Sequence, residues 1–145
     1  MTKIFTIRQP FASAMLVSVG AKDIENRRQK TDMRGRVGVH AGKQWHERAV
    51  EADKRLPRGA ILGTVQIVGC HAAGAGCNAA DCYDNPWAET LTDGCGLPQN
   101  EPPIFHWELD SPRRFVTPIR ATGMLGFWTP GPSVEYLMSI AEVEA

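Results

Sequence analysis

A cation, a carboxylate and a second cation stand close together in the segment Gly20-Ala21-Lys22-Asp23-Ile24-Glu25-Asn26-Arg27. Side chains alternate between the two faces of a β-strand, so Glu25 and Arg27 share one face. Lys22 joins that face only if the strand starts late or is bulged. An ammonium, a carboxylate and a guanidinium together bind a phosphate or a polar base edge, and they are suited to moving a proton. The spacing predicts one polar cleft lined by the three side chains; the alternative is a charged edge strand that faces water.

Length and composition define the class of protein. The chain has 145 residues, of which 43% are apolar and 22% charged, so we expect a single soluble domain over residues 1–145. No apolar run approaches the roughly 20 residues that span a bilayer, and the N-terminus lacks the apolar core of a signal peptide. We therefore expect a cytoplasmic protein that does not associate with membranes.

Charge is balanced overall but uneven along the chain. The formal net charge is zero, which argues against strong non-specific binding of a polyanion. Residues 22–58, however, contain eleven basic and six acidic side chains, a local excess of five positive charges. This pattern predicts modest, local binding of an anionic ligand through a few phosphate contacts, with an affinity that falls steeply in salt.

Apolar periodicity predicts short strands and a few helices. Helical spacing of Phe11, Met15, Leu16 and Val19 predicts a helix that starts at Pro10 and ends at Gly20, and similar spacing predicts a second helix from Trp45 to Leu56. The expected strands are Lys3–Ile7, Lys22–Arg27, Arg36–Ala41, Ala60–His71, Ile104–Leu109, Arg113–Ile119 and Met124–Trp128. A terminal helix is expected from Ser133. These elements predict an α+β fold, a small, curved and partly closed β-barrel flanked by two or three helices.

An irregular region interrupts this order at about residues 73–103. It is rich in Gly, Asn, Asp and Pro, and we expect a loop insertion with one short helix around Pro86–Leu91. The four cysteines fall at its start or inside it, at Cys70, Cys77, Cys82 and Cys95. Because the paired C-x2-C spacing typical of zinc sites is absent, we expect free thiols, no metal and no cofactor. A zinc site and disulfides are the alternatives.

Several of these motifs, in this order, resemble the ASCH domain (activating signal cointegrator homology). They are Phe5-Thr6-Ile7-Arg8-Gln9-Pro10-Phe11-Ala12, the Gly-x-Lys-x-x-Glu-Asn-Arg segment, Arg34-Gly35-Arg36-x-x-x-His40-Ala41-Gly42-Lys43, Gly59–Cys70 and Gly126-Phe127-Trp128. The resemblance extends over the chain except Ala73–Pro103. It implies a PUA-like fold, a small β-barrel flanked by helices.

The resemblance also implies a nucleic-acid function. PUA-like domains mostly bind RNA or modified bases, so RNA or a nucleotide is the expected partner and DNA the alternative. The expected ligand-binding residues are Arg8, Gln9, Lys22, Glu25, Arg27, Arg36, His40 and Lys43. The oligomeric state is left open.

Two other functions stay open. One bacterial branch of the family hydrolyses the acetyl amide of N4-acetylcytidine with a lysine, a threonine and a glutamate, and another is described as cutting single-stranded RNA. Lys22 matches the lysine, whereas Glu25 stands where that branch has threonine. If the protein is such a hydrolase, Lys22 and Glu25 are its catalytic residues; otherwise it binds its ligand without turnover. The third possibility is a protein-interaction module that uses the 73–103 loop.

Overall fold

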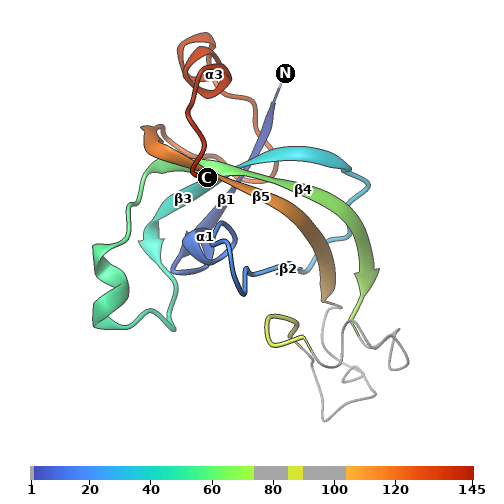
Figure 1. Ribbon diagram of the computed structural model, residues 1–145. Coiled ribbons are helices and arrows are strands. Elements are labelled where there is room, and N and C mark those ends of the chain that lie inside the picture. The colour runs from blue at the N-terminus through green and yellow to red at the C-terminus, as the bar shows by residue number, and fades with distance from the viewer. Residues whose placement is uncertain (1, 74–84, 90–103) are drawn as a thin grey trace. The chain divides into compact units, whose positions relative to one another are not determined.

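Five strands form one sheet in the order β1-β3-β4-β5-β2 (Figure 1). The computed structural model describes residues 2–73, 85–89 and 104–145. The strands are β1 (Lys3–Gln9), β2 (Ile24–Arg27), β3 (Gly35–Trp45), β4 (Ala60–Ala72) and β5 (Phe105–Arg120). The helices of the described residues are α1 (Phe11–Ala14) and α3 (Pro132–Ser139), with a 3₁₀ turn, η1 (Glu51–Arg55).

Strand direction makes the sheet a mixed one. β1 pairs in parallel with β3, from Lys3 opposite Val37 to Gln9 opposite Trp45. β2 pairs antiparallel with β5, with Glu25 opposite Trp107. β1 and β2 are the two ends of the strand order. The strand order is open, so the sheet does not close into the expected partial barrel, whereas the expected α+β class is confirmed.

The chain divides into two compact units. Unit 1 comprises Met1–Ala21, Arg36–Gln66 and Ser111–Ala145, and unit 2 comprises Lys22–Gly35 and Ile67–Asp110. β4 and β5 each contribute residues to both units. The organisation as one domain over residues 1–145 stays a prediction.

Unit 1 is held by a core of aliphatic and aromatic side chains. Ile4 of β1, Ile61 of β4 and Phe115 and Ile119 of β5 pack with Trp128. Burying such side chains stabilises a fold by roughly 1.5–3 kcal/mol each. Ile4 and Trp128 also exchange two backbone hydrogen bonds of 2.8 and 2.9 Å, so the chain after β5 is tied to β1.

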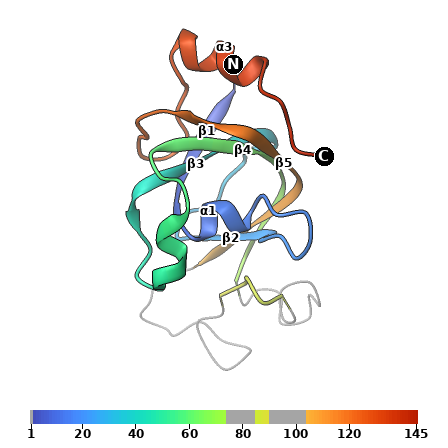
Figure 2. The same cartoon turned by 60° about the vertical axis from the view of Figure 1, so that its left-hand side comes forward.

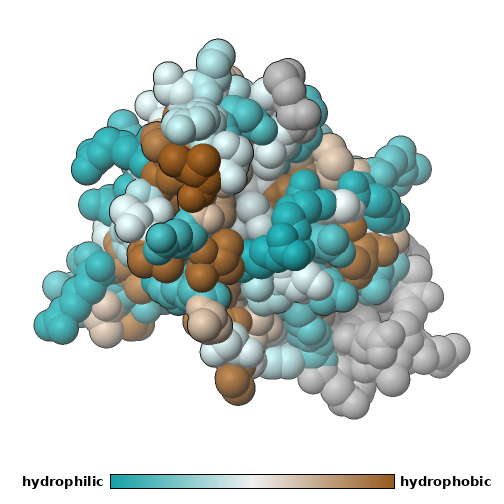
Figure 3. All heavy atoms as spheres, turned by 45° about the horizontal axis from the view of Figure 1, so that its top comes forward, coloured by the Kyte–Doolittle hydropathy of each residue, from teal (hydrophilic) through white to brown (hydrophobic). Residues whose placement is uncertain are grey.

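Helix α3 completes this core with only one of its faces. Met138 packs against the core cluster, whereas Tyr136, Leu137 and the following Ile140 are exposed. Figure 3, which turns this end toward the viewer, shows apolar atoms gathered among polar ones on the surface. None of the helices formed by the described residues has the length and apolar character needed to cross a membrane.

Both helices expected in the first half of the chain are corrected. α1 ends at Ala14 rather than near Gly20 and is a short helix of four residues (Figure 2). In place of a helix from Trp45 to Leu56, β3 runs through Trp45, and η1 follows as one 3₁₀ turn. The pairing of Trp45 with Gln9 explains the second error, because sheet hydrogen bonds override a local helical pattern.

The strand predictions were closer. β2 starts at Ile24 rather than Lys22, and the two strands expected at Ile104–Leu109 and Arg113–Ile119 are one continuous strand, β5. Met124–Trp128 is not a strand; only Trp128 forms an isolated bridge, to Ile4. Of the expected 73–103 loop, Ala73 and residues 85–89 are described; Pro86 and Trp87 form a turn, and the rest lies outside the described residues.

Candidate functional site

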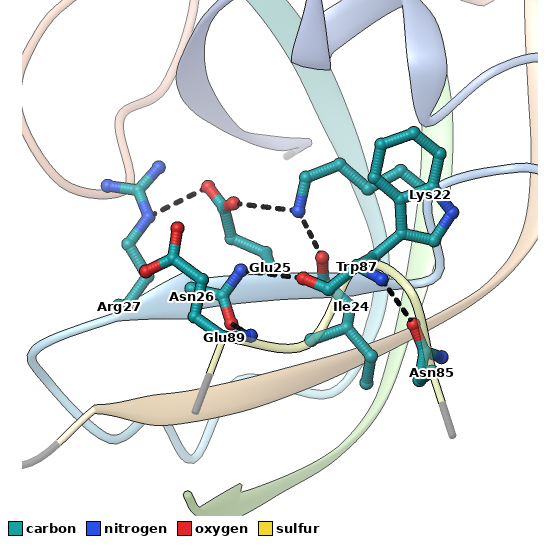
Figure 4. Close-up of polar contacts among 8 residues, drawn as sticks. All are labelled: Lys22, Ile24, Glu25, Asn26, Arg27, Asn85, Trp87 and Glu89. Atoms are coloured by element: carbon teal, nitrogen blue, oxygen red, sulfur yellow. Dashed lines mark hydrogen bonds and ion pairs between the residues drawn. The ribbon is translucent and has the colours of Figure 1, made fainter. Parts of the chain in front are cut away.

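Lys22, Glu25 and Arg27 form one chain of polar contacts in unit 2 (Figure 4). The Lys22 amine lies 3.4 Å from Glu25 Oε1, and Arg27 Nε donates to Glu25 Oε2 at 3.0 Å. Lys22 Nζ also donates to the backbone oxygen of Ile24. Because β2 starts only at Ile24, Lys22 precedes the strand and is not bound by its alternation. The structure thus brings the three predicted side chains together.

Burial separates the two ends of this chain. Lys22 is 3% exposed and Glu25 8%, whereas the Arg27 side chain is 32% exposed. A charged edge strand facing water is therefore excluded, although β2 is an edge strand. Arg27 is the accessible end of the cluster.

Burial changes the acidity of the Lys22 ammonium. Desolvation lowers the pKa of Lys22 from its ordinary 10.5, because a buried charge loses its hydration. The charge of Glu25 and its hydrogen bond oppose that shift, and so does the charge of Glu89. A lysine with a lowered pKa is a better proton acceptor near neutral pH than an exposed lysine.

An aromatic ring supports Arg27. The Arg27 guanidinium carbon lies 5.4 Å from the centre of the Trp107 ring, within the range of a cation–π interaction. Trp107 is held in turn, because its Nε1 donates to the backbone oxygen of Gln29 at 2.9 Å. The plane of the guanidinium is therefore oriented by groups on both β2 and β5.

The segment Asn85–Glu89 is attached to β2 through Asn26. Asn26 Nδ2 donates to the Trp87 carbonyl at 2.9 Å, and Asn26 Oδ1 accepts from the Glu89 amide at 2.9 Å. Through these two bonds the Asn26 side-chain amide binds the backbone of the segment in the way that the backbone of a neighbouring strand would bind it. They fix Glu89, whose charge acts on Lys22. Sequence reasoning missed Asn26 and Glu89, since about 60 residues separate them and no pattern links them.

Two histidines of unit 2 also lie together, and neither was predicted as a site residue. His71 Nε2 and His106 Nδ1 are 3.1 Å apart. His106 Nε2 lies 2.8 Å from the Glu89 carbonyl, and His71 Nδ1 lies 3.4 Å from a carboxylate oxygen of Glu108. His106 is fully buried, and desolvation lowers its pKa.

The other predicted ligand residues belong to unit 1. Arg8 is exposed and donates to Gln44 Oε1 at 3.0 Å. Gln9 is fully buried; its Nε2 donates to Ser13 Oγ and to the Pro57 carbonyl at 2.8 and 2.7 Å. The buried amide of Gln9 thus has a structural role.

Arg36, His40 and Lys43 lie along β3. Arg36 Nη1 donates to Thr64 Oγ1 and to the Ser111 carbonyl, each at 2.9 Å. His40 is buried between the Ala121 carbonyl, 2.7 Å from its Nε2, and Thr6 Oγ1, 3.2 Å from its Nδ1. Since a carbonyl only accepts, His40 Nε2 carries the proton. Lys43 is exposed.

Of the four cysteines, only Cys70 belongs to the described residues, and it is a free, half-buried thiol. Cys77, Cys82 and Cys95 lie outside the described residues. Within the described part of the chain, no group of three or more His, Cys, Asp or Glu side chains is arranged to hold a metal ion.

Comparison with solved structures identifies the fold. The chain is similar to the crystal structure of ASCH from Zymomonas mobilis, with a TM-score of 0.63 over 97% of this chain and 96% of that chain, at 12% identity. The chain has an ASCH fold. Two mutant proteins of the same ASCH give TM-scores of 0.61 and 0.59, again at 12% identity; the matches cover 97% of this chain and 99% and 96% of theirs.

The ASCH fold confirms the resemblance drawn from the motifs. At 12% identity the likeness concerns the fold, and function has to be argued from the site. No protein-family model matches the sequence, and no curated protein matches it.

Proposed function

We propose that this ASCH-fold chain binds RNA or a modified nucleotide through Arg27 and Glu25, with Lys22 holding Glu25 in place. The observation that carries the proposal is the difference in burial between the two ends of the cluster. Its lysine end is buried, and its arginine end is accessible. A ligand that approaches the surface therefore meets the guanidinium first and the carboxylate next.

The chemistry of the two outer groups suits a nucleotide. A guanidinium pairs with phosphate through parallel N–H donors, and the Trp107 ring beneath Arg27 orients those donors. A carboxylate accepts the exocyclic N–H of cytosine. The Lys22 amine lies 3.4 Å from this carboxylate and holds it in position. The cluster therefore offers donors for a phosphate and an acceptor for a base.

The test is the affinity of a labelled single-stranded RNA for the wild type and for Arg27→Ala, with Lys30→Ala as control. Lys30 is exposed on the same unit, so the control removes the same charge outside the cluster. We expect Arg27→Ala to weaken binding about tenfold, which is the effect of losing one charge-assisted contact of about 1.5 kcal/mol. If both variants bind RNA equally weakly, the RNA is held by non-specific charge attraction and not by a contact specific to Arg27. A DNA of the same sequence tests the alternative partner.

Hydrolysis of an acylated cytidine is the second candidate. It is favoured by the lowered pKa of the buried Lys22 and by the second carboxylate, Glu89, whose charge acts on that amine. In this reaction Lys22 accepts a proton from the attacking water, the amide C–N bond breaks, and the proton passes to the leaving cytosine amine. In this candidate reaction Glu89 is the carboxylate that acts beside Lys22.

Incubation with N4-acetylcytidine separates the two candidates. The hydrolase candidate requires release of cytidine and acetate by the wild type and loss of that release in Lys22→Met. Product formed equally by Lys22→Met would exclude Lys22 as the base. If the protein retains RNA but forms no product, the hydrolase candidate is excluded and the binding function is supported.

A further inference from the structure

We propose that unit 1 binds a small organic anion with an apolar body, in a hollow between helix α3 and the sheet. The hollow has a volume of about 390 Å³, within the range of roughly 300–1,000 Å³ typical of small-molecule sites. The described residues that line it all belong to unit 1, whereas Lys22, Glu25 and Arg27 belong to unit 2. The proposal therefore concerns a second site and does not depend on RNA binding.

Apolar side chains form one part of the lining. They come from β5, from α3 and from the segment that follows α3: Phe115, Met138, Ala141 and Val143. Met138 and Ala141 also pack against the core cluster to which Phe115 belongs, so this part of the lining is continuous with the core of unit 1. An aromatic or aliphatic group of a ligand would leave water and contact these side chains, which is the main favourable term in binding at such sites.

Backbone hydrogen bonds fix the C-terminal segment that forms one wall of the hollow. Val143 makes an antiparallel bridge with Phe115 of β5. Next to this bridge, the Val116 amide donates to the Glu142 carbonyl at 2.8 Å. Because this wall is paired with β5, the hollow exists before a ligand enters it, and binding does not have to order the segment first.

Two guanidinium groups among the lining residues favour an anion. Arg113 of β5 is exposed, and Arg36 of β3 is half-buried. Arg36 is held in place, because its Nη1 donates to Thr64 Oγ1 and to the Ser111 carbonyl, each at 2.9 Å. Guanidinium groups bind carboxylates and phosphates through parallel N–H donors. The two arginines therefore offer an anion one accessible cation and one whose position is fixed.

The lining also includes the carboxylate of Glu135 in α3. Its Oε1 accepts from the Thr2 amide at 3.2 Å and from Thr2 Oγ1 at 3.0 Å, and its Oε2 is buried. One oxygen is thus occupied and the other is shielded from solvent, whereas Arg113 is exposed. Two guanidiniums and this one carboxylate give the described lining residues a net charge of +1, which favours an anionic ligand over a cationic one.

The experiment titrates the full chain with anilinonaphthalene sulfonate, an aromatic anion whose fluorescence rises in apolar surroundings. We expect saturable binding to the wild type. Arg113→Gln should weaken it by about tenfold, the effect of losing one charge-assisted contact. Arg113 is substituted rather than Arg36, because Arg36 also holds Thr64 and Ser111. Displacement of the dye by benzoate and by phenyl phosphate distinguishes a carboxylate ligand from a phosphate ligand. Benzamide, which is neutral, should displace it about tenfold less effectively than benzoate.

The control is Arg120→Gln, which removes another exposed arginine of β5 that is not among the described lining residues. It should bind the dye as the wild type does. Near-ultraviolet circular dichroism establishes that each variant keeps its tertiary packing, since loosened proteins also bind this dye. Wild-type affinity in Arg113→Gln would overturn the proposal, and so would equal weakening in both variants. A wild type that does not bind the dye, or from which benzamide displaces it as well as benzoate does, would overturn it too.

Discussion

At the scale of single residues, Glu25 is the centre of the candidate site. One of its oxygens faces the Lys22 amine and the other accepts from Arg27 Nε. A buried ammonium is costly unless a charge and hydrogen bonds compensate it, and Glu25 supplies most of that compensation. The same carboxylate therefore serves both the stability of unit 2 and the position of Arg27.

Removal of this carboxylate should destabilise the protein. Glu25→Ala removes the carboxylate that faces the buried Lys22 amine, and we expect a loss of about 3 kcal/mol in the free energy of unfolding. Glu25→Gln keeps one acceptor oxygen and should lose less. Urea denaturation measures both.

The matched control is Glu51→Ala, which breaks an exposed ion pair of 3.2 Å with Lys54. Exposed pairs contribute little, so the control should show no measurable change. If Glu25→Ala unfolds at the same urea concentration as the wild type, Lys22 does not depend on Glu25, and the description of the cluster is wrong.

His40 gives unit 1 a predicted sensitivity to acid. Burial lowers the pKa of His40 below its ordinary 6.5, and the bond to the Ala121 carbonyl opposes that shift. The unfolded chain therefore binds a proton at His40 at a higher pH than the folded chain does. The free energy of unfolding should fall as the pH drops below 6.5 toward the folded pKa, by at most about 1.4 kcal/mol per pH unit from this group.

Urea denaturation between pH 5 and pH 8 measures this slope. His40→Gln should be less stable at every pH, because it disrupts the contacts with Ala121 and Thr6. Its stability should nevertheless depend less steeply on pH over this range. An unchanged slope in the variant would mean that His40 is not the group that resists protonation.

At the scale of elements, Asn26 replaces a missing strand partner for the Asn85–Glu89 segment. We expect the Glu89 amide to exchange its hydrogen faster in Asn26→Ala, because that amide donates to Asn26 Oδ1. Asn26→Asp keeps an acceptor at this position and should protect the amide, although it cannot donate to the Trp87 carbonyl. Hydrogen exchange followed by NMR measures both variants; equally slow exchange in Asn26→Ala would show that other contacts hold the segment.

A second prediction at this scale concerns Gly63, where β4 approaches β5. A Cβ atom at Gly63 would lie 2.2 Å from the Arg113 carbonyl oxygen, a backbone atom that cannot turn away. Gly63→Ala should therefore cost about 1–3 kcal/mol of stability, measured by urea denaturation. At Gly131 nothing lies within 4 Å of an added Cβ, so Gly131→Ala should cost much less. Similar losses in the two variants would contradict this packing.

The helices and strands also show which parts of the fold the sequence patterns predicted correctly and which they did not. The alternation that places Glu25 and Arg27 on one face was a local prediction, and both residues lie on β2; the expected start of that strand at Lys22 was wrong, since β2 begins at Ile24. The helix expected from Trp45 was wrong because this part of the chain pairs with a strand that is distant in sequence. β1 pairs with β3 at that point, and periodicity within one segment contains no information about such pairing.

At the scale of the whole molecule, the motifs were sufficient to predict the ASCH fold but not the complete candidate site. Trp107 and Glu89 meet the cluster from positions tens of residues away in the chain, and Glu89 does so through its bond to Asn26 of β2. His71 and His106 are likewise brought together by the fold alone, 35 residues apart in sequence. Residue types at fixed spacing predicted the three charged side chains, and only tertiary structure adds their supporting partners.

At the scale of the whole molecule, the salt dependence of RNA affinity tests most directly whether Arg27 contacts a phosphate. With a net charge of zero, the chain should contact only a few phosphates, and each contact adds to the fall of its RNA affinity with salt. Each phosphate contact on a single strand contributes a slope of about 0.7 in log affinity against log salt. We therefore propose to measure that slope for the wild type, Arg27→Ala and Lys30→Ala. We expect a slope about 0.7 smaller in Arg27→Ala and a wild-type slope in Lys30→Ala; equal slopes in all three proteins would contradict a phosphate contact at Arg27.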